Sequence, residues 1–178
     1  VPKPSPGGSD PKRTKFTYYS GVVRLAETAA ANTKNRSHTI EADITVPEKG
    51  GEGVLVAIGG SSGGYSFYVQ DGKLVYHFNW FDETRTVITS SEPVPAGKST
   101  VRFDFAYDGG GPGKGGNGIL FVNDEKVAEG RLEHTQAGIF SADETADVDI
   151  ELGTPMVAAI GAEAKSKFTA RIPTVTVE

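Results

Sequence analysis

The sequence predicts an all-β protein, a two-sheet antiparallel β-sandwich of the jelly-roll kind. Three observations predict it: many short runs of alternating apolar and polar residues, turn signals between those runs, and almost no stretch with a helical apolar stripe. The 178 residues include 23 glycines and 10 prolines, a composition that suits short strands joined by tight turns. A chain of this length forms one domain with a substantial core.

The chain is expected to divide into a Pro/Gly-rich linker or tail over residues 1–15 and a single sandwich domain over residues 16–178. The opening segment, VPKPSPGGSDPKR, holds four prolines and has no hydrophobic period. It offers no apolar face to bury, so we expect it to add nothing to the core.

Alternating residues mark the individual strands from residue 15 onward. HTIEADITV (38–46) and STVRFDFAY (99–107) place apolar side chains on one face and polar side chains on the other. GVLVAIG (53–59) is apolar throughout, as expected of a strand that is buried on both faces. Further strands are predicted in these segments: 15–19, 65–80, 118–132, 147–152 and 170–178. Only 24–34 and 156–167 have helical character.

Two hairpins are predicted from their turn residues. Asp71-Gly72 separates two aromatic-rich runs, and both positions tolerate the positive φ of a type I′ turn. A second hairpin is expected to turn near Asn123-Asp124. The glycine-rich segment 109–118 precedes a strand rather than a helix, so it is predicted to be a loop and not a phosphate site.

Composition excludes several classes of function. The net charge is −5 without a dense Lys/Arg cluster, so nucleic acid is not an expected partner. No apolar run approaches the ~20 residues that cross a bilayer, so no membrane partner is expected either. The absence of cysteine excludes disulfides, thiolate nucleophiles and cysteine zinc sites. No cofactor is expected, and the composition is compatible with any compartment.

Aromatic residues suggest a sugar-stacking platform, with Trp80, Tyr68 and Tyr107 as the predicted ligand-binding residues. Flat rings pair with the apolar faces of pyranoses. Alternation sends Tyr65 and Phe67 to one side of their strand and Tyr68 to the other, so part of the aromatic set belongs to the core. Trp80 ends its strand beside Phe-Asp-Glu, which makes it the best candidate for exposure.

The acidic stretch DVDIE, residues 147–151, allows two functional hypotheses. On a strand, Asp147, Asp149 and Glu151 would share one face and could serve as the carboxylates of a glycosidase. Clustered carboxyl oxygens could also bind calcium, with Asp143, Asp147 and Asp149 as weak candidate ligands. We favour a third interpretation, in which the acids form a solvated loop and strand without a metal.

Several longer segments resemble the C-terminal domain of large bacterial arylsulfatases. YYSGVVRL (18–25), NRSHTI (35–40) and YDGGGPGKGG (107–116) carry the likeness, which runs in order over most of the chain. The resemblance implies a concanavalin A-like or laminin-G-like sandwich that packs against a sulfatase catalytic domain of the same parent chain. The sequence departs from the family at Ser61-Ser62 and in DVDIELGTP (147–155).

The catalytic parts of that family are missing from this chain. The family requires a Cys or Ser in a C/S-x-P-x-R motif, and the nearest segment, SEPVP (91–95), has Pro95 in place of the arginine. We therefore expect a non-catalytic accessory domain that shapes access to a sulfatase site. The first alternative is a free-standing carbohydrate-binding module. The second is a β-glucan hydrolase using Asp147, Asp149 and Glu151, although residues four apart on a strand lie about 13 Å apart and a retaining pair needs ~5–5.5 Å.

Overall fold

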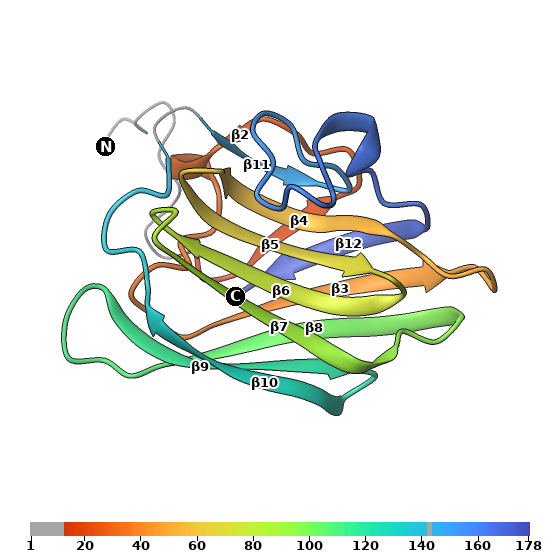
Figure 1. Ribbon diagram of the computed structural model, residues 1–178, viewed down its shortest axis with the longest axis horizontal. Helices are drawn as coiled ribbons and strands as arrows, with labels where there is room; N and C mark the ends of the chain where they lie inside the picture. Colours follow the sequence, from red (N-terminus) through yellow and green to blue (C-terminus); the bar gives the residue numbers. More distant parts are fainter. Residues whose placement is uncertain (1–12, 142–143) are drawn as a thin grey trace, which may run out of the picture.

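The computed structural model describes residues 13–141 and 144–178, which fold as a sandwich of two antiparallel sheets (Figure 1). Sheet A has the strand order β1 (Phe16–Tyr19), β12 (Arg171–Val177), β3 (His38–Val46), β8 (Gly97–Tyr107), β9 (Lys114–Val122), β10 (Glu125–His134). Sheet B has the order β2 (Leu25–Ala26), β11 (Thr145–Val148), β4 (Gly53–Gly60), β5 (Gly63–Gln70), β6 (Lys73–Trp80), β7 (Thr84–Pro93). The predicted fold class is confirmed. The predicted linker falls almost entirely on residues 1–12, outside the described residues.

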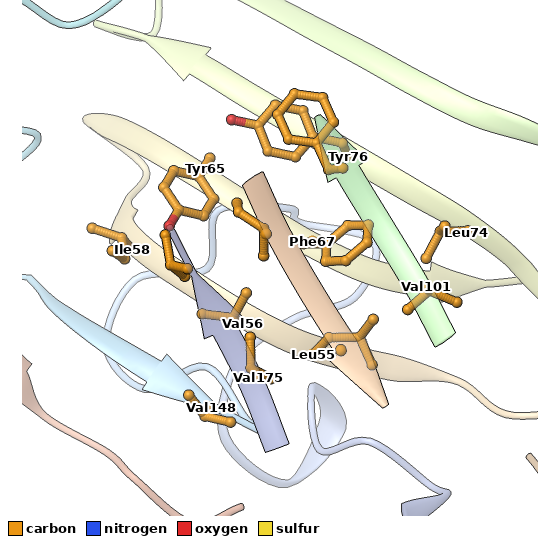
Figure 2. Close-up of a cluster of buried hydrophobic side chains, with 14 of the residues drawn as sticks. Leu55, Val56, Ile58, Tyr65, Phe67, Leu74, Tyr76, Val101, Val148 and Val175 are labelled. Carbon is orange, nitrogen blue, oxygen red and sulfur yellow. The ribbon is translucent and has the colours of Figure 1, made fainter. Parts of the chain in front are cut away.

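The core lies between the inner faces of the two sheets. In β3, residues Ile40, Ala42, Ile44 and Val46 face inward, as the alternation predicts. Across the sandwich, the ring of Tyr76 in β6 stacks on that of Phe103 in β8. Figure 2 shows how Leu55, Tyr65 and Phe67 of sheet B gather with Val101 and Val175 of sheet A. One continuous apolar layer therefore joins the two sheets.

Both predicted hairpin turns are present. Asp71 and Gly72 have φ of 52° and 72°, and Gln70 pairs with Lys73, so the turn has two residues with positive φ. Asn123 and Asp124 have φ of 51° and 63° and join β9 to β10 in the same way.

The segments predicted to have helical character form single short 3-10 turns. These are η1 (Glu27–Ala29), which follows β2, and η2 (Glu163–Lys165). Neither turn buries a residue of its own, which agrees with the lack of a long apolar stripe. Among the described residues, no helix has the length and apolar character needed to cross a membrane.

The outer faces of the two sheets differ. Residues 149–167, coloured blue in Figure 1, lie over the outer face of sheet B. There Met156 and Val157 pack on Val54, Tyr68 and Val75 in a second apolar cluster. This cover explains why every residue of β4 is buried, as predicted for a strand enclosed on both faces. The outer face of sheet A carries half-exposed polar side chains such as Arg102 and Asp104.

Candidate ligand-binding groove

The structure places the three predicted ligand-binding residues in three different environments. Tyr68 is buried on the outer face of sheet B, beneath residues 149–167. Tyr107 is half-buried, and its hydroxyl donates a hydrogen bond to the carbonyl of Gly111, so it holds the glycine-rich loop. Trp80 is half-buried at the end of β6 and lines a surface groove. The structure therefore does not bring the three rings together.

The groove beside Trp80 is almost entirely apolar. It has a volume of about 340 Å³ and is lined by Trp80, Phe81, Gly113 and residues 135–139. Phe81 is 51% exposed and Ile139 is 59% exposed, so two large exposed apolar side chains line the same groove. Exposed apolar side chains that gather at a concave place mark a binding site more often than scattered ones do. We refer to this feature as the Trp80 groove.

Contacts from both sheets fix the ring of Trp80. The inward-facing residues of β6 are Leu74, Tyr76 and Phe78, and Trp80 continues that row at the end of the strand. Its ring stacks on the imidazole of His134 in β10, with centroids 4.4 Å apart and planes 22° apart. Phe81 meets the same indole edge-on at 5.4 Å. These ring contacts from two strands hold the aromatic floor of the groove in place.

The turn after Trp80 holds Phe81 in a backbone conformation that bulky residues avoid. Phe81 and Asp82 have φ of 52° and 58°, in the left-handed region. Asn79 keeps the turn in place: its Oδ1 accepts the Asp82 N–H at 2.9 Å, and its Nδ2 donates to the Ser61 carbonyl at 2.8 Å. Arg85 adds a bond from Nη2 to Asp82 Oδ1 at 2.7 Å. Such strain persists where the surroundings dictate it, and it clusters at functional sites.

Asn35 ties the opposite wall of the groove together. Its Oδ1 accepts the Gly113 N–H at 2.7 Å, and its Nδ2 donates to the Ala137 carbonyl at 3.0 Å. The Thr135 hydroxyl donates to the Lys114 carbonyl at 2.7 Å, which fixes the start of the 135–139 loop. In the sequence, Asn35 begins the segment NRSHTI and the triplet Asn-Arg-Ser, which matches the N-glycosylation sequon, a pattern that chance often supplies. Its contacts span 78 and 102 residues along the chain, so no local pattern could reveal its position in the wall.

The acidic stretch does not form the single strand face that its alternation predicts. Strand β11 ends at Val148, because Asp149 adopts a φ of 73° and turns the chain away from the sheet. The prediction of a solvated acidic face is also wrong. Asp147, Asp149 and Glu151 are only 1%, 7% and 1% exposed.

Each of these carboxylates accepts hydrogen bonds from nearby loops. Asp147 accepts the N–H of Arg24 at 2.6 Å and that of Leu152 at 2.9 Å. Asp149 accepts the hydroxyl of Ser20 at 2.8 Å. These bonds join the 20–24 loop to the segment that covers sheet B. Buried carboxylates with such partners organise the surrounding backbone.

Glu151 is the one acid of the three with a buried oxygen that lacks a partner among the described residues. Its Oε1 accepts the Met156 N–H at 2.5 Å, while Oε2 has no hydrogen bond. Burial, with a smaller effect of the neighbouring Asp147, raises the pKa of Glu151 to about 7, and the hydrogen bond from Met156 opposes the rise. The lining of the Trp80 groove contains none of the three acids.

No metal centre is evident in residues 13–141 and 144–178, where no group of three or more His, Cys, Asp or Glu side chains is arranged to hold an ion. Of the weak candidate ligands, Asp147 and Asp149 have the hydrogen bonds described above. Asp143 lies outside the described residues.

No family model matches this chain, and no curated protein matches it. Solved structures of similar fold include the CBM40 module of the Ruminococcus gnavus IT-sialidase bound to alpha2,6 sialyllactose. It is 16% identical, with a TM-score of 0.61 over 91% of this chain and 90% of that chain. Domains LG4-5 of the mouse laminin alpha1 chain are 11% identical, with a TM-score of 0.53 over 100% of this chain and 46% of that one.

A leech intramolecular trans-sialidase is 14% identical, with a TM-score of 0.55 over 93% of this chain and 25% of that one. At identities this low the likeness establishes the fold, a jelly-roll sandwich of the concanavalin A-like and laminin-G-like kind.

Proposed function

We propose that this chain is a non-catalytic carbohydrate-binding domain that holds a sugar in the Trp80 groove. The observation that carries the proposal is the pairing of a fixed indole with an exposed Phe81 whose backbone is strained. Aromatic rings bury large apolar areas, and tryptophan is well suited to a surface site because its ring offers a broad flat face. An apolar concavity with few polar groups is the usual form of a small-ligand site.

The structural neighbours support this choice of ligand. One of them is a carbohydrate-binding module bound to sialyllactose, although the similarity to this chain is one of fold. The buried acids support the non-catalytic part of the proposal. Asp147 is engaged with two backbone N–H groups, which leaves it poorly placed to act on a substrate.

The test is a glycan array probed with the parent chain, Trp80→Ala and Phe81→Ala. Both variants should lose at least 10-fold in affinity for whichever glycan the parent binds, since each removes a ring from the groove. Tyr19→Ala is the matched control, because Tyr19 is an exposed aromatic residue (63%) that does not line the groove. If the parent bound no glycan, or if Tyr19→Ala lost as much as the groove variants, the proposal would fail.

A second candidate is the accessory role that the arylsulfatase resemblance implies. Tyr19 and Val23 are large apolar side chains that stand exposed on the 19–24 connection, and they form the kind of surface that packs against another domain. In a parent chain with a sulfatase domain, Tyr19→Ser with Val23→Ser should weaken the contact between domains and expose it to protease. Cleavage at an unchanged rate would remove this candidate.

A further inference from the structure

The segment 156–165 lies over the outer face of sheet B but is not paired with it (Figure 1). Its flanks are fixed to β4. On one side the Asp149 N–H donates to the Leu55 carbonyl at 3.1 Å, and on the other the Ser166 carbonyl accepts the Val54 N–H at 2.8 Å. Within the part of the chain that the structure describes, no backbone group of the segment itself bonds to a strand backbone. We call this segment, which spans the distance between two fixed ends, the lid.

Glu151 and Met156 hold the lid down. Oε1 of Glu151 accepts the Met156 N–H at 2.5 Å, and the Glu151 carbonyl accepts the Glu163 N–H at 2.7 Å. The Met156 carbonyl accepts from Nη1 of Arg85, in β7, at 2.8 Å. The Met156 side chain is fully buried and packs in the apolar cluster that includes Tyr68. One glutamate therefore contacts the lid at two points, and one methionine joins it to the sheet.

The face of sheet B that the lid covers also carries buried polar atoms without partners. Ser66 of β5 and His77 of β6 lie opposite each other, on the same face as Tyr68. The Ser66 hydroxyl and Nε2 of His77 are buried and have no hydrogen bond among the described residues, and Oε2 of Glu151 is a third such atom. Burial of an unpaired polar group is unfavourable, and water would satisfy it. Hydration of these atoms therefore offsets part of the apolar contact that the lid loses on opening.

We propose that residues 156–165 open as a lid while the two sheets stay folded, and that the proton on Glu151 keeps the lid closed. Loss of that proton places a negative charge on a carboxylate whose Oε2 has no donor, near the acids Asp147 and Glu144. Opening lets water solvate the charge and breaks only the few bonds of the lid, so it requires less free energy than global unfolding. The open state uncovers Tyr68 and its neighbours on the sheet.

Glu151 titrates in the range that matters for this lid. Burial, with a smaller effect of Asp147, raises its pKa from 4.5 to about 7, so the stability of the closed lid is fully present below pH 4.5 and is lost as the pH rises through 7. Burial lowers the pKa of His77 to about 4 and raises that of Tyr68 to about 12, so both stay neutral between pH 5.5 and pH 8.5. β4 supplies only apolar residues and glycines. The other charged groups around the lid are Arg85 of β7, the exposed Glu163 and Lys165 of η2, and the Lys167–Asp149 ion pair.

A single introduced thiol reports on opening, because the chain has no cysteine of its own. Ser66→Cys places the thiol on the covered face, Val101→Cys places it in the core between the sheets, and Ser62→Cys places it on the surface. The rate of alkylation is measured at pH 5.5 and pH 8.5 and is divided by the rate for Ser62→Cys at the same pH, which corrects for ionisation of the thiol. The same set is prepared with Glu151→Gln.

We expect the normalised rate for Ser66→Cys to rise roughly 10-fold or more from pH 5.5 to pH 8.5, and to stay constant when Glu151→Gln is present. Val101→Cys should stay protected at both pH values. Hydrogen exchange read by NMR repeats the test without a new thiol. The amides of Met156 and Glu163, corrected for intrinsic rates, should exchange roughly 10-fold faster at pH 8.5 in the parent chain, and the amides of β3 should not.

Each contrary result overturns a stated part of the proposal. A rise for Ser66→Cys that persists with Glu151→Gln would overturn the role of Glu151. Labelling of Val101→Cys at the rate of Ser66→Cys, or exchange of β3 together with the lid, would show global unfolding and overturn the lid itself. A constant rate for Ser66→Cys and constant exchange at Met156 would do the same. The lining of the Trp80 groove contains no residue of the lid, so these outcomes leave the proposed sugar site untouched.

Discussion

Phe81 combines an unfavourable backbone conformation with an exposed side chain, and this combination points to a function for the residue. A bulky side chain with φ of 52° is expensive, since the left-handed conformation costs roughly 1–2 kcal/mol for residues other than glycine. The side chain is 51% exposed, so burial in the core does not offset that cost. Stacking of the proposed ligand on the ring would account for a bulky residue at this position.

The positive φ of Phe81 predicts that a glycine variant at this position is more stable than an alanine variant. Phe81→Gly should be more stable than Phe81→Ala by about 1 kcal/mol, because glycine adopts positive φ without the steric penalty of a Cβ. At most positions, where φ is negative, the alanine variant is the more stable of the two. Chemical denaturation of the two variants measures the difference, and alanine at least as stable as glycine would show that the turn does not hold residue 81 in this conformation.

Glu151 predicts a dependence of stability on pH. Its pKa in the folded state, about 7, lies above the ordinary value of 4.5, so its contribution to stability is fully present below pH 4.5. That contribution is lost as the pH rises through 7, since the folded protein must then bury a carboxylate. Glu151→Gln should therefore stabilise the fold by about 2 kcal/mol at pH 8 and change it little at pH 4.5.

Urea unfolding of parent and Glu151→Gln at the two pH values provides the measurement. Glu125→Gln is the control, because Glu125 is an exposed glutamate at the start of β10. A gain from Glu151→Gln that was the same at pH 4.5 and pH 8 would contradict the assignment of the shift to a buried carboxyl group.

At the scale of elements, local patterns predict most of the sandwich. The alternation of residues 38–46 gives β3 with its actual bounds, and the turn dipeptides place both hairpins. Local patterns fail for DVDIE, since alternating acids look like a polar strand face wherever they occur. Their true environment depends on Arg24, Ser20 and the 152–167 segment, which lie far away along the chain or outside any strand. Trp80 could be predicted from the sequence as a candidate ligand-binding residue. The 135–139 loop, which faces it across the groove, could not be predicted as part of the site.

The hairpin at Asp71-Gly72 gives a prediction at the same scale. The carboxylate of Glu52 accepts the N–H groups of both turn residues, at 3.0 Å and 2.9 Å, and Gly72 has a φ of 72°. A Cβ at Gly72 would only touch Pro93 at 3.5 Å, so the backbone conformation and not space limits substitution. Gly72→Val should cost about 1 kcal/mol or more, and Gly72→Asn much less, because asparagine tolerates positive φ. Thermal unfolding compares the two, and equal midpoints would refute the type I′ turn.

At the scale of the whole molecule, the covered outer face of sheet B and the Trp80 groove are separate features. Residues 149–167 cover the outer face of sheet B, and the acids beneath them bind the backbone of that cover. The Trp80 groove lies at another place, where the end of β6 meets the end of β10. The proposed binding site and the hydrogen bonds that hold the cover therefore lie in separate parts of the sandwich.

This separation predicts that the chain hydrolyses neither aryl sulfates nor β-glucans. It has no cysteine and no C/S-x-P-x-R motif, and Asp147 is engaged with backbone N–H groups. The assay uses a chromogenic aryl sulfate and mixed-linkage glucan, with Glu151→Gln beside the parent chain. Turnover by the parent that disappeared in Glu151→Gln would restore a glycosidase role for the buried acids.

Fluorescence reports directly on binding of a sugar at Trp80, because Trp80 is the only tryptophan of the chain. Emission and acrylamide quenching are followed during titration with a glycan that binds in the array. We expect emission to move to shorter wavelength and quenching to fall, since a bound sugar shields the half-buried indole. Both titrations should give the dissociation constant that calorimetry measures. Binding by calorimetry with unchanged emission and unchanged quenching would place the ligand elsewhere and refute binding at Trp80.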